Sequence, residues 1–471
     1  MIYFAVCVRK MRNFIQNPAN MLKKIPKQPQ LEMFQTILKS FINPNHELCL
    51  LAEEIDWNYL EKEFAPLYSN TGRPSVPVRT IVGLLLLKQI YNLGDETVMD
   101  RWLENPYWQH FCGEVYFQYK LPFDPSDFVH FRKRIGEEGM KKIFQQSILL
   151  FGEDTLKKAT KEVRVDTTVQ EKNITYPTDR KLYTKVHQYC QRIAKKEGIK
   201  FKRTYSKKIK QLQYQLRFTR SPKNYKKHMK LQEKYRRLVV KLCDDLVNQL
   251  SNEQFEKNSE IFDVLYRILV QERKDKDKIY SVHEPLTQCI AKGKDHKPYE
   301  FGNKSSFAYT RDEGIIVGAM AFEDNPYDGH TLEPQLNQIK ELTGFNPKVA
   351  IVDRGYKGQD LIGKTQVVLP INLKKESYYK KKQRQARQRS RAGVEGLISH
   401  LKIDHRMLRN YLSGVNGDKV NTLLAATAYN MKKWMRQMKE ELIFSLLRFF
   451  FHRLYSALEY VQISMPQKKW G

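Results

Sequence analysis

An apolar segment at residues 348–353 (KVAIVD) is the feature that most restricts how this 471-residue chain can fold. Such a near-continuous apolar run is typical of a strand buried on both faces of a sheet, with helices covering it. Residues 162–170 (EVRVDTTVQ) alternate in polarity and are rich in β-branched side chains, so they predict a second strand. Residues 366–371 predict a third, and residues 299–309 and 314–323 predict a hairpin. The sequence therefore predicts an α/β protein.

The part of the chain before the first strand is expected to be helical, from about residue 30 to 150. Residues 81–91 (IVGLLLLKQIY) predict an apolar helix, Asp95 is expected to cap a helix that runs to about Trp108, and Ser126 with Asp127 to cap another. In this last helix the inward residues are expected to be Phe128, Phe131, Ile135, Met140 and Ile143, and the outward ones Arg132, Lys133, Arg134, Lys141 and Lys142. Short helices with a basic face fit a helix-turn-helix-like DNA-binding module, and they fit any small helical domain equally well.

Helices are also expected among and after the later strands. Residues 331–342 predict an amphipathic helix that ends at Gly344. Residues 374–391 carry nine Lys and Arg against one Glu, and they predict a basic loop that leads into a helix at about 392–405. Two further helices are expected at about 419–436 and 440–461.

Positive charge restricts the partners of the chain. It has 82 Lys and Arg against 52 Asp and Glu, a formal net charge of +30, so a polyanion is expected to bind it. Nucleic acid is the first candidate and an anionic membrane surface the second. Residues 180–241 hold 22 Lys and Arg against two acidic residues, with tyrosines interleaved, and predict long polar helices broken at Ser221-Pro222. We interpret this segment as binding a phosphate backbone.

Two other classes of protein are not indicated. No apolar run approaches the roughly 18 residues of a membrane-spanning helix, and residues 1–8 lack the pattern of a secretory signal. The six cysteines lie far apart without a C-x-x-C pair. We therefore expect reduced thiols in a cytosolic protein, rather than a zinc site or a disulfide framework.

Three acidic residues stand where an α/β fold presents its reactive groups. Asp166 lies in or at the end of the first strand, Asp353 closes the apolar strand before Arg-Gly-Tyr, and Glu395 lies in the first turns of a helix. Carboxylate oxygens are the ligands that Mg²⁺ and Mn²⁺ prefer, and two-metal phosphodiester chemistry needs such ligands. Each acid taken alone could equally cap a helix or pair with a basic residue.

Four motifs then resemble one family, in its order along the chain. They are VDTTVQEKNITYPTD (165–179), KGKDHKPYEFGNK (292–304), IVDRGYKG (351–358) and VEGLISHLKIDHRM (394–407). Together they resemble the DDE transposases of bacterial insertion sequences, and most closely the insertion-sequence-five group within the insertion-sequence-four-like class. The resemblance covers the chain from about residue 30 to 436.

The resemblance implies a fold, an activity and a cofactor. The fold would be a ribonuclease-H-like mixed-sheet catalytic domain at 160–436, with an all-α DNA-binding domain at 30–155 that recognises terminal repeats. Residues 180–278 would be a basic helical insertion, residues 1–29 an N-terminal extension and residues 437–471 a C-terminal helical tail. Asp166, Asp353 and Glu395 would be the catalytic residues and would hold two Mg²⁺ (or Mn²⁺) ions for cleavage and strand transfer. The partners would be double-stranded DNA and, on DNA, a second copy of the chain.

The broader class also has a signature of Tyr, Arg, Glu and Lys around its glutamate. Arg391, Glu395 and Lys402 fit its last three positions, whereas Gln388 stands at the tyrosine position. Intervals of four and seven residues place the three on one helix face. The DNA-binding residues expected on this basis and from the basic segments are Arg391, Lys402, Arg354, Lys304, Lys207, Lys208 and Lys210.

Other interpretations are weighed against this one. Glu395, His400 and His405 could suggest a zinc helix, but five-residue steps do not keep side chains on one face. Paired carboxylates could serve a glycosidase, but a basic chain favours a phosphodiester substrate. No phosphate-binding loop for ATP is present. A DNA-binding remnant of a transposase and a metal-dependent nuclease remain as alternatives, and Met11 is a plausible start instead of Met1.

Overall fold

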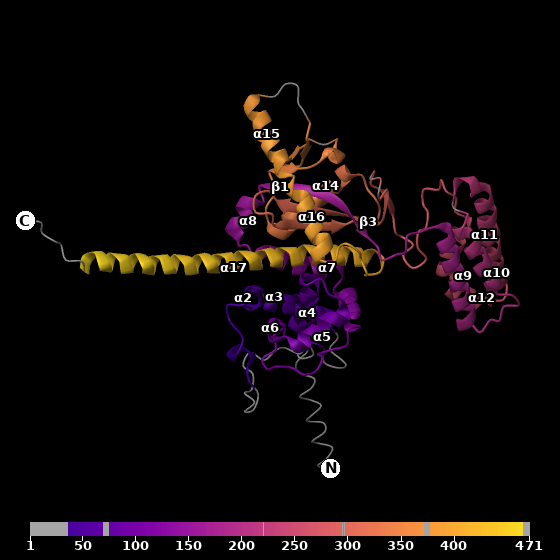
Figure 1. Cartoon of the computed structure of the whole chain (residues 1–471), viewed down its shortest axis with the longest axis horizontal. Helices are drawn as coiled ribbons and strands as arrows, with labels where there is room; N and C mark the ends of the chain where they lie inside the picture. Colours follow the sequence, from indigo (N-terminus) through magenta and orange to yellow (C-terminus); the bar gives the residue numbers. More distant parts are fainter. Residues whose placement is uncertain are drawn as a thin grey trace, which may run out of the picture.

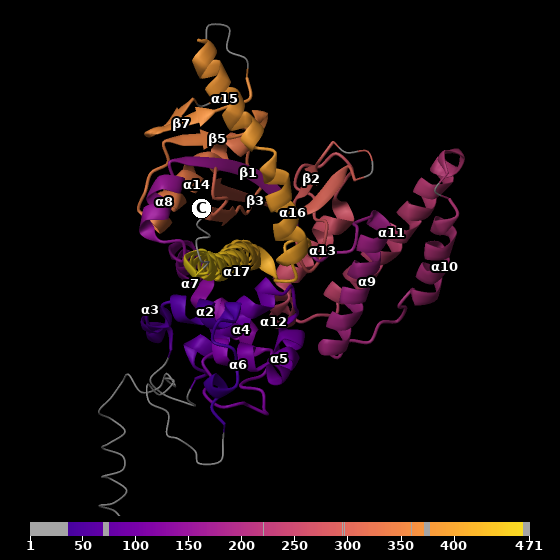
Figure 2. The same cartoon turned by 60° about the vertical axis from the view of Figure 1, so that its left-hand side comes forward.

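The structure, a computed structural model, describes residues 36–464 except 69–74, 220, 294, 296, 359 and 372–376. Side chains near the end of the chain are described up to Phe444 and at Leu447 and Arg448. The expected extension at 1–29 and the choice between Met1 and Met11 lie outside the described residues. Figures 1 and 2 show a helical part near the N-terminus, a sheet with its covering helices, and a separate group of helices to one side.

The N-terminal part is helical, as predicted. Its α-helices are α2 (Glu47–Glu54), α3 (Trp57–Phe64), α4 (Val78–Ile90), α5 (Asp95–Glu104), α6 (Pro106–Phe111), α7 (Asp127–Leu149) and α8 (Glu153–Ala159). Helix α4 is buried along almost its whole length, as its apolar sequence predicts. The five apolar residues predicted to face inward from α7 are all buried.

Three expectations about this part are wrong. Asp95 does not cap its helix, because its carboxylate pairs with Lys88 at 2.5 Å and with Arg132 at 2.9 Å. Arg132 is consequently buried and does not face solvent. The helix after Asp95 also ends at Glu104, since the Asn105 side chain accepts hydrogen bonds from two backbone amides of α6 and Pro106 begins that new helix.

The sheet has seven strands, β1 (Glu162–Glu171), β2 (Cys289–Ala291), β3 (Tyr299–Thr310), β4 (Ile316–Ala321), β5 (Val349–Ile351), β6 (Leu361–Ile362) and β7 (Thr365–Val368). Their order is β2-β3-β1-β5-β7-β6, and β4 also pairs with β3. β1 pairs antiparallel with β3 and parallel with β5, so the sheet is mixed. The predicted strands and hairpin are confirmed.

Helices cover both faces of this sheet. On one face Gly318 of β4 packs against Gln335 and Ile339 of α14 (Asp328–Thr343), which ends at Gly344 in the left-handed conformation, as predicted. On the other face Ser305 of β3 hydrogen-bonds to Thr422 of α17 (Gly414–Ser464) at 3.0 Å. Helix α16 (Gly393–Asp404) contacts β1.

The end of the chain differs from expectation in two places. The expected basic loop contains helix α15 (Tyr378–Ser390), which begins after the capping side chain of Ser377. Lys, Arg and Gln favour helix and neither Gly nor Pro interrupts this segment, but it has no apolar stripe to reveal the helix. The two helices expected after 419 are one continuous helix, α17, because no helix breaker separates them.

The basic segment folds on its own core. Its helices are α9 (Asp179–Lys196), α10 (Ser206–Arg217), α11 (Tyr225–Val247), α12 (Asn252–Lys257) and α13 (Ser259–Val270), with the predicted break between α10 and α11. Their apolar residues form a cluster distinct from the main core. The main core, by contrast, combines the N-terminal helices, the sheet and α17 in one cluster. Figure 1 shows α17 running between the N-terminal helices and the sheet.

No described helix is long and apolar enough to cross a membrane.

Candidate active site

The pairing of β1 with β5 brings two of the three predicted acids side by side. In this parallel pair Arg164 lies opposite Ile351. Asp166 and Asp353 each follow two residues later, so they occupy matching positions beside each other. Asp166 lies within β1, and Asp353 directly follows β5. Side chains at matching positions of two paired parallel strands project from the same face, so the two carboxylates are neighbours.

Asp353 is fixed by the turn that follows it. Its Oδ1 accepts a hydrogen bond from the Gly355 amide at 2.7 Å, which caps the short 3-10 turn Arg354–Tyr356. A Cβ atom on Gly355 would come within 2.9 Å of that oxygen, so a residue with a side chain could not stand there without a shift. The Asp-Arg-Gly-Tyr sequence therefore holds one carboxylate at the sheet edge.

Asp166 lies in a site that disfavours its negative charge. Burial raises the pKa of its carboxyl to about 6, the nearby Arg391 guanidinium opposes this, and the charges of Asp353 and Asp328 add to it. The Thr167 amide donates to its Oδ1 at 2.9 Å. Two carboxylates held together in this way call for a positive charge between them.

The third predicted acid approaches the site from α16. Arg391, at the junction of α15 and α16, places its guanidinium 3.5 Å from Asp166 Oδ2. Glu395 follows one helical turn later and is exposed. Within the described residues no group of three or more His, Cys, Asp or Glu side chains lies in an arrangement that could hold a metal ion. The structure thus brings Asp166 and Asp353 together, whereas Glu395 is exposed on α16, the helix that contacts β1.

The other signature positions are more distant from the acids. Gln388 donates its side-chain amide to the Val368 carbonyl at 2.9 Å, which attaches α15 to β7. Burial lowers the pKa of Lys402, whose acidic neighbours are Glu300 and Glu171 at the far end of β1. Lys402 therefore faces a different part of the sheet from Asp166. The tyrosines nearest in sequence, Tyr378 and Tyr379, are exposed at the start of α15.

Among the other basic residues expected to contact DNA, Arg354 is exposed directly beside Asp353. Lys207, Lys208 and Lys210 are exposed on α10, whose apolar side holds the buried Ile209. Lys304 is instead engaged inside the protein, since its ammonium lies 2.8 Å from Asp328 Oδ1 and 2.6 Å from the Pro326 carbonyl.

Asp328, the first residue of α14, is not among the residues that the sequence predicts for the site. Its Oδ1 accepts hydrogen bonds from the Thr167 hydroxyl at 2.9 Å and from Lys304. Its only signal in the sequence is an acid at the start of a helix, which usually indicates a favourable charge at the positive end of the helix dipole. Only the structure shows that α14 starts beside the end of β5.

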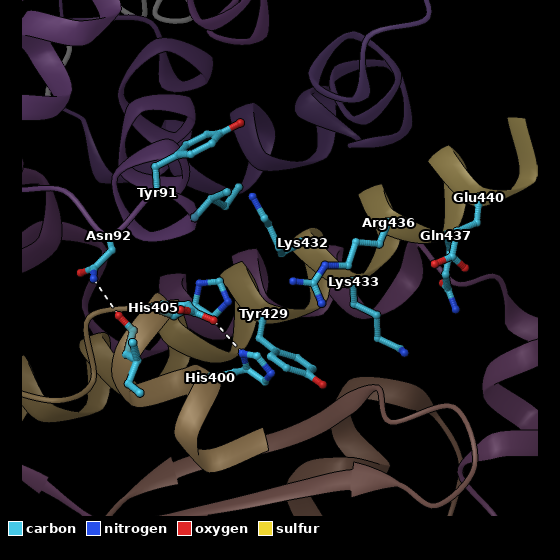
Figure 3. A pocket seen from close by; sticks show the side chains of 13 residues that line it. Tyr91, Asn92, His400, His405, Tyr429, Lys432, Lys433, Arg436, Gln437 and Glu440 are labelled. Atoms are coloured by element: carbon cyan, nitrogen blue, oxygen red, sulfur yellow. Dashed lines mark hydrogen bonds and ion pairs between the residues drawn. The ribbon is translucent and has the colours of Figure 1, made fainter. Parts of the chain in front are cut away.

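A cavity of about 760 Å³ lies elsewhere, where the end of α4 meets α16 and α17 (Figure 3). His400 contacts Asp404 at 2.6 Å there, while the buried His405 ring lies 3.3 Å from the Gln89 carbonyl oxygen. Each ring has a protein partner, and the described residues form no zinc site around Glu395, His400 and His405.

The three acids predicted for the site are of the donor type that divalent cations with a preference for oxygen bind. Asp166, Asp353 and Glu395 supply carboxylates only, which suits Mg²⁺ or Mn²⁺ and does not suit a metal that prefers thiolate or imidazole. The juxtaposition of Asp166 and Asp353 on paired parallel strands is the observation that supports such a cation, and no third acidic residue completes a metal-binding group among the described residues.

Two family models match parts of the chain. Residues 36–134 match a family model described as Transposase domain, and residues 273–431 match one described as Transposase DDE domain. The second match includes Asp353 and Glu395 but begins after the helical segment that separates β1, with Asp166, from the rest of the sheet. An uncharacterized protein, ORF8 in the nfe locus of Rhizobium meliloti, is 40% identical over 191 residues, which cover 39% of this chain and 90% of that protein. No solved structure matches the chain.

Proposed function

Because the chain belongs to the DDE-domain transposases of insertion sequences, we propose that it binds the ends of such an element and carries out DNA cleavage and strand transfer there. The observation that carries the proposal is the pair of carboxylates, Asp166 and Asp353, at one edge of a mixed sheet with Glu395 on the adjoining helix. We place the chain in the insertion-sequence-five group on the four motifs described above.

The catalytic region is proposed to be ribonuclease-H-like. Three observations support this: a mixed sheet in which β1 lies between an antiparallel and a parallel neighbour, one acid on β1 and one after β5, and the third acid on α16, a helix that contacts β1. Residues 160–436 would form this domain, with 180–278 inserted after β1. Residues 30–155 would recognise the element's ends, and residues 437–471 would form a tail.

Asp166, Asp353 and Glu395 would hold two Mg²⁺ or Mn²⁺ ions. When bound, such ions lower the pKa of a water or activate a DNA 3′-hydroxyl, and they stabilise the leaving oxygen. The protein's own contribution is to position the DNA and to neutralise phosphate charge. Arg391 and the exposed Arg354 stand beside the two aspartates and would contact the phosphates next to the scissile bond.

The remaining basic residues would hold DNA further from the reaction. Lys207, Lys208 and Lys210 of α10 and Lys402 of α16 would contact phosphates along the duplex. The expected partners are double-stranded DNA, with its terminal inverted repeats and target, and a second copy of the chain when assembled on DNA. The site of action would be the bacterial cytoplasm, on the nucleoid.

The test uses isosteric variants of the three acids on a duplex that carries the inverted repeats flanking the gene. Asp166→Asn, Asp353→Asn and Glu395→Gln should each abolish nicking in Mg²⁺ while gel-shift binding in Ca²⁺ persists, because each loses a ligand charge and keeps its shape. Glu333→Gln, at an exposed position of α14, is the matched control and should cleave normally.

Three outcomes would contradict parts of the proposal. Wild-type cleavage by an acid variant would remove that residue from the site. Binding without any wild-type cleavage would indicate an inactive transposase remnant. Cleavage without preference for the repeats and without strand transfer would indicate a nuclease.

A further inference from the structure

Aromatic side chains are exposed where α10 is followed by α11. Tyr214 and Phe218 lie four residues apart at the end of α10, and their rings are in edge contact with centroids 4.9 Å apart. Tyr225, the first residue of α11, is 60% exposed, and Phe218 is 66% exposed. Figures 1 and 2 show both helices on the outer side of the molecule, away from the sheet. The residues that the structure describes therefore leave these rings largely uncovered.

A hollow of about 570 Å³ lies beside Tyr225. The other described residues that line it are Thr219, Ser221, Pro222 and His228, and none of them is acidic. The Thr219 hydroxyl and Nδ1 of His228 are 2.9 Å apart, so this contact ties the turn to α11. Sites for small ligands commonly have volumes of about 300–1,000 Å³. Together with Tyr214 and Phe218, these five lining residues form what we call the hairpin tip.

The chain around the hairpin tip is strongly cationic. Residues 198–232 contain twelve Lys and Arg and no Asp or Glu. Those that the structure describes are all exposed, and none of them pairs with a described acid. By contrast, Arg236 and Arg237, further along α11, both pair with Glu233. The surface around the exposed rings therefore attracts an anionic ligand and has no internal counter-charge.

Single-stranded nucleic acid matches both properties of the hairpin tip. Its phosphates are anionic, and each unpaired base presents an aromatic face on which a tyrosine or phenylalanine ring can stack. In a duplex the base faces are covered by neighbouring base pairs, and proteins reach only the base edges in the grooves. Exposed aromatic rings among lysines are therefore better suited to unpaired bases than to a duplex.

We propose that the hairpin tip binds unpaired bases of a DNA strand. Tyr225 and Phe218 stack on the bases. The exposed Lys223, Lys226 and Lys227 hold the adjoining phosphates. This inference rests on the proposed function for the identity of the nucleic acid. It adds a site for single strands to the duplex phosphates that α10 is proposed to contact.

The experiment compares two short fluorescent oligonucleotides of equal length, an oligothymidylate and an abasic strand, by anisotropy with the full-length protein. The two strands carry the same phosphates and differ only in the bases. The wild type should bind oligothymidylate more tightly than the abasic strand. Tyr225→Ala and Phe218→Ala should each weaken oligothymidylate binding by about fivefold or more, which corresponds to about 1 kcal/mol of stacking per base. Binding of the abasic strand should not change.

Conservative variants separate stacking from apolar contact. Tyr225→Phe keeps the ring and should bind as the wild type does, whereas Tyr225→Leu lacks an aromatic face and should behave as Tyr225→Ala. Tyr176→Ala is the matched control, since it removes a ring that is 57% exposed and lies outside residues 198–232. It should retain wild-type binding of both strands. All these variants change exposed side chains, so their melting temperatures should stay within a few degrees of the wild type.

Several results would overturn the inference. Equal binding of the two strands by the wild type would do so, as would an unchanged preference in Tyr225→Ala or an equal loss for both strands. Vesicles that contain phosphatidylserine and sedimentation velocity test two other occupants. If Tyr225→Ala lost vesicle binding or self-association while its oligothymidylate binding stayed normal, the hairpin tip would bind a membrane surface or a second copy of the chain.

The proposed function fails in a different measurement. If the wild type did not cleave DNA and still preferred oligothymidylate through Tyr225, the proposed activity would be wrong and the single-strand site would stand. If the wild type cleaved normally and Tyr225→Ala kept the full preference for oligothymidylate, only the role of the hairpin tip would be refuted.

Discussion

The guanidinium of Arg391 lies 3.5 Å from Oδ2 of Asp166. Arg391 stands between α15 and α16, and Asp166 lies in β1, so this contact joins the helices to the sheet. The Nε atom of the same side chain is buried and has no hydrogen-bond partner in the described part of the chain. Arg391 is therefore a partly satisfied cation, one helical turn before Glu395. A DNA phosphate could complete its hydrogen bonding.

Arg391→Ala should lower the rate of strand cleavage by about tenfold or more, or about 1.4 kcal/mol in the barrier, with a melting temperature within a few degrees of the wild type. The reason is that a preorganised cation beside the phosphate stabilises charge that develops during the reaction. Single-turnover cleavage at saturating DNA measures the effect. Arg389→Ala, an exposed arginine of α15, is the control. A normal rate combined with a large drop in melting temperature would assign Arg391 to the fold.

DNA binding by the basic helical insertion, residues 180–278, should depend strongly on the salt concentration. A plot of the logarithm of the binding constant against the logarithm of the salt concentration has a negative slope. Each phosphate that the protein neutralises contributes about 0.9 to that slope. Changing Lys207, Lys208 and Lys210 together to Glu should reduce this slope, because all three face solvent while Ile209 holds the helix in its core. Fluorescence anisotropy across a salt series measures it.

The matched control for that variant changes Lys157, Lys158 and Lys161 to Glu, three exposed lysines outside the insertion. This control variant changes the net charge of the protein by the same amount as the variant of Lys207, Lys208 and Lys210. An identical slope in the two triple variants would show that net charge, rather than a contact surface on α10, sets the salt dependence.

Lys172 should be among the most important residues for stability. Its buried ammonium lies 2.9 Å from Asp418 and 3.1 Å from Glu284, and it donates to the Gly414 carbonyl at 2.8 Å. Lys172→Met leaves both acids buried without their cation, so it should lower the free energy of unfolding by about 3–5 kcal/mol. Chemical denaturation followed by circular dichroism measures this. Lys157→Met, at an exposed site, should change it little, and an equally small effect at Lys172 would contradict the expected cost.

Acid should destabilise the protein through His405. Burial lowers the pKa of His405 to about 4, whereas a histidine in the unfolded chain titrates near 6.5. Between these values the unfolded state takes up a proton that the folded state does not, so stability falls as the pH falls from about 6.5 towards 4.

His405→Gln should therefore make the pH dependence of the free energy of unfolding shallower, by up to about 1.4 kcal/mol per pH unit. Denaturation between pH 6.5 and 5 is the useful window, since most carboxylates stay ionised there. The exposed His130→Gln should leave the slope as it is in the wild type. If His405→Gln retained the full wild-type slope, buried His405 would not be the residue that takes up the proton.

The sequence was sufficient for elements that carry their own signal. The apolar strand β5, the alternating strand β1 and the glycine that ends α14 each have a local pattern that determines their structure. Helix α15 was missed because its residues are almost all polar, so nothing in their order distinguishes a solvated helix from a loop. Arg132 was placed at the surface because its partner, Asp95, belongs to a different helix.

For the candidate site too, the sequence predicts the positions that have a local pattern and not those that depend on contacts between distant elements. The place of Asp353 after a strand and before Gly355, and that of Asp166 within a strand, both follow from the local sequence. That Asp328 stands beside them depends on where α14 begins relative to β5, a relation between elements that no local pattern encodes. The distance of Lys402 from Asp166 likewise follows from the direction of α16 across the sheet.

The N-terminal helices, the sheet and α17 share a single core. This shared core bears on the distance along the DNA between a recognised sequence and a cut. If the N-terminal helices recognise a sequence and the sheet region cuts, as proposed, the two parts cannot move apart, because α17 packs against both and the movement would expose their shared core to water. The separation between recognised bases and severed bond is then a property of the folded chain. Every cut would then fall at the same number of base pairs from the recognised sequence.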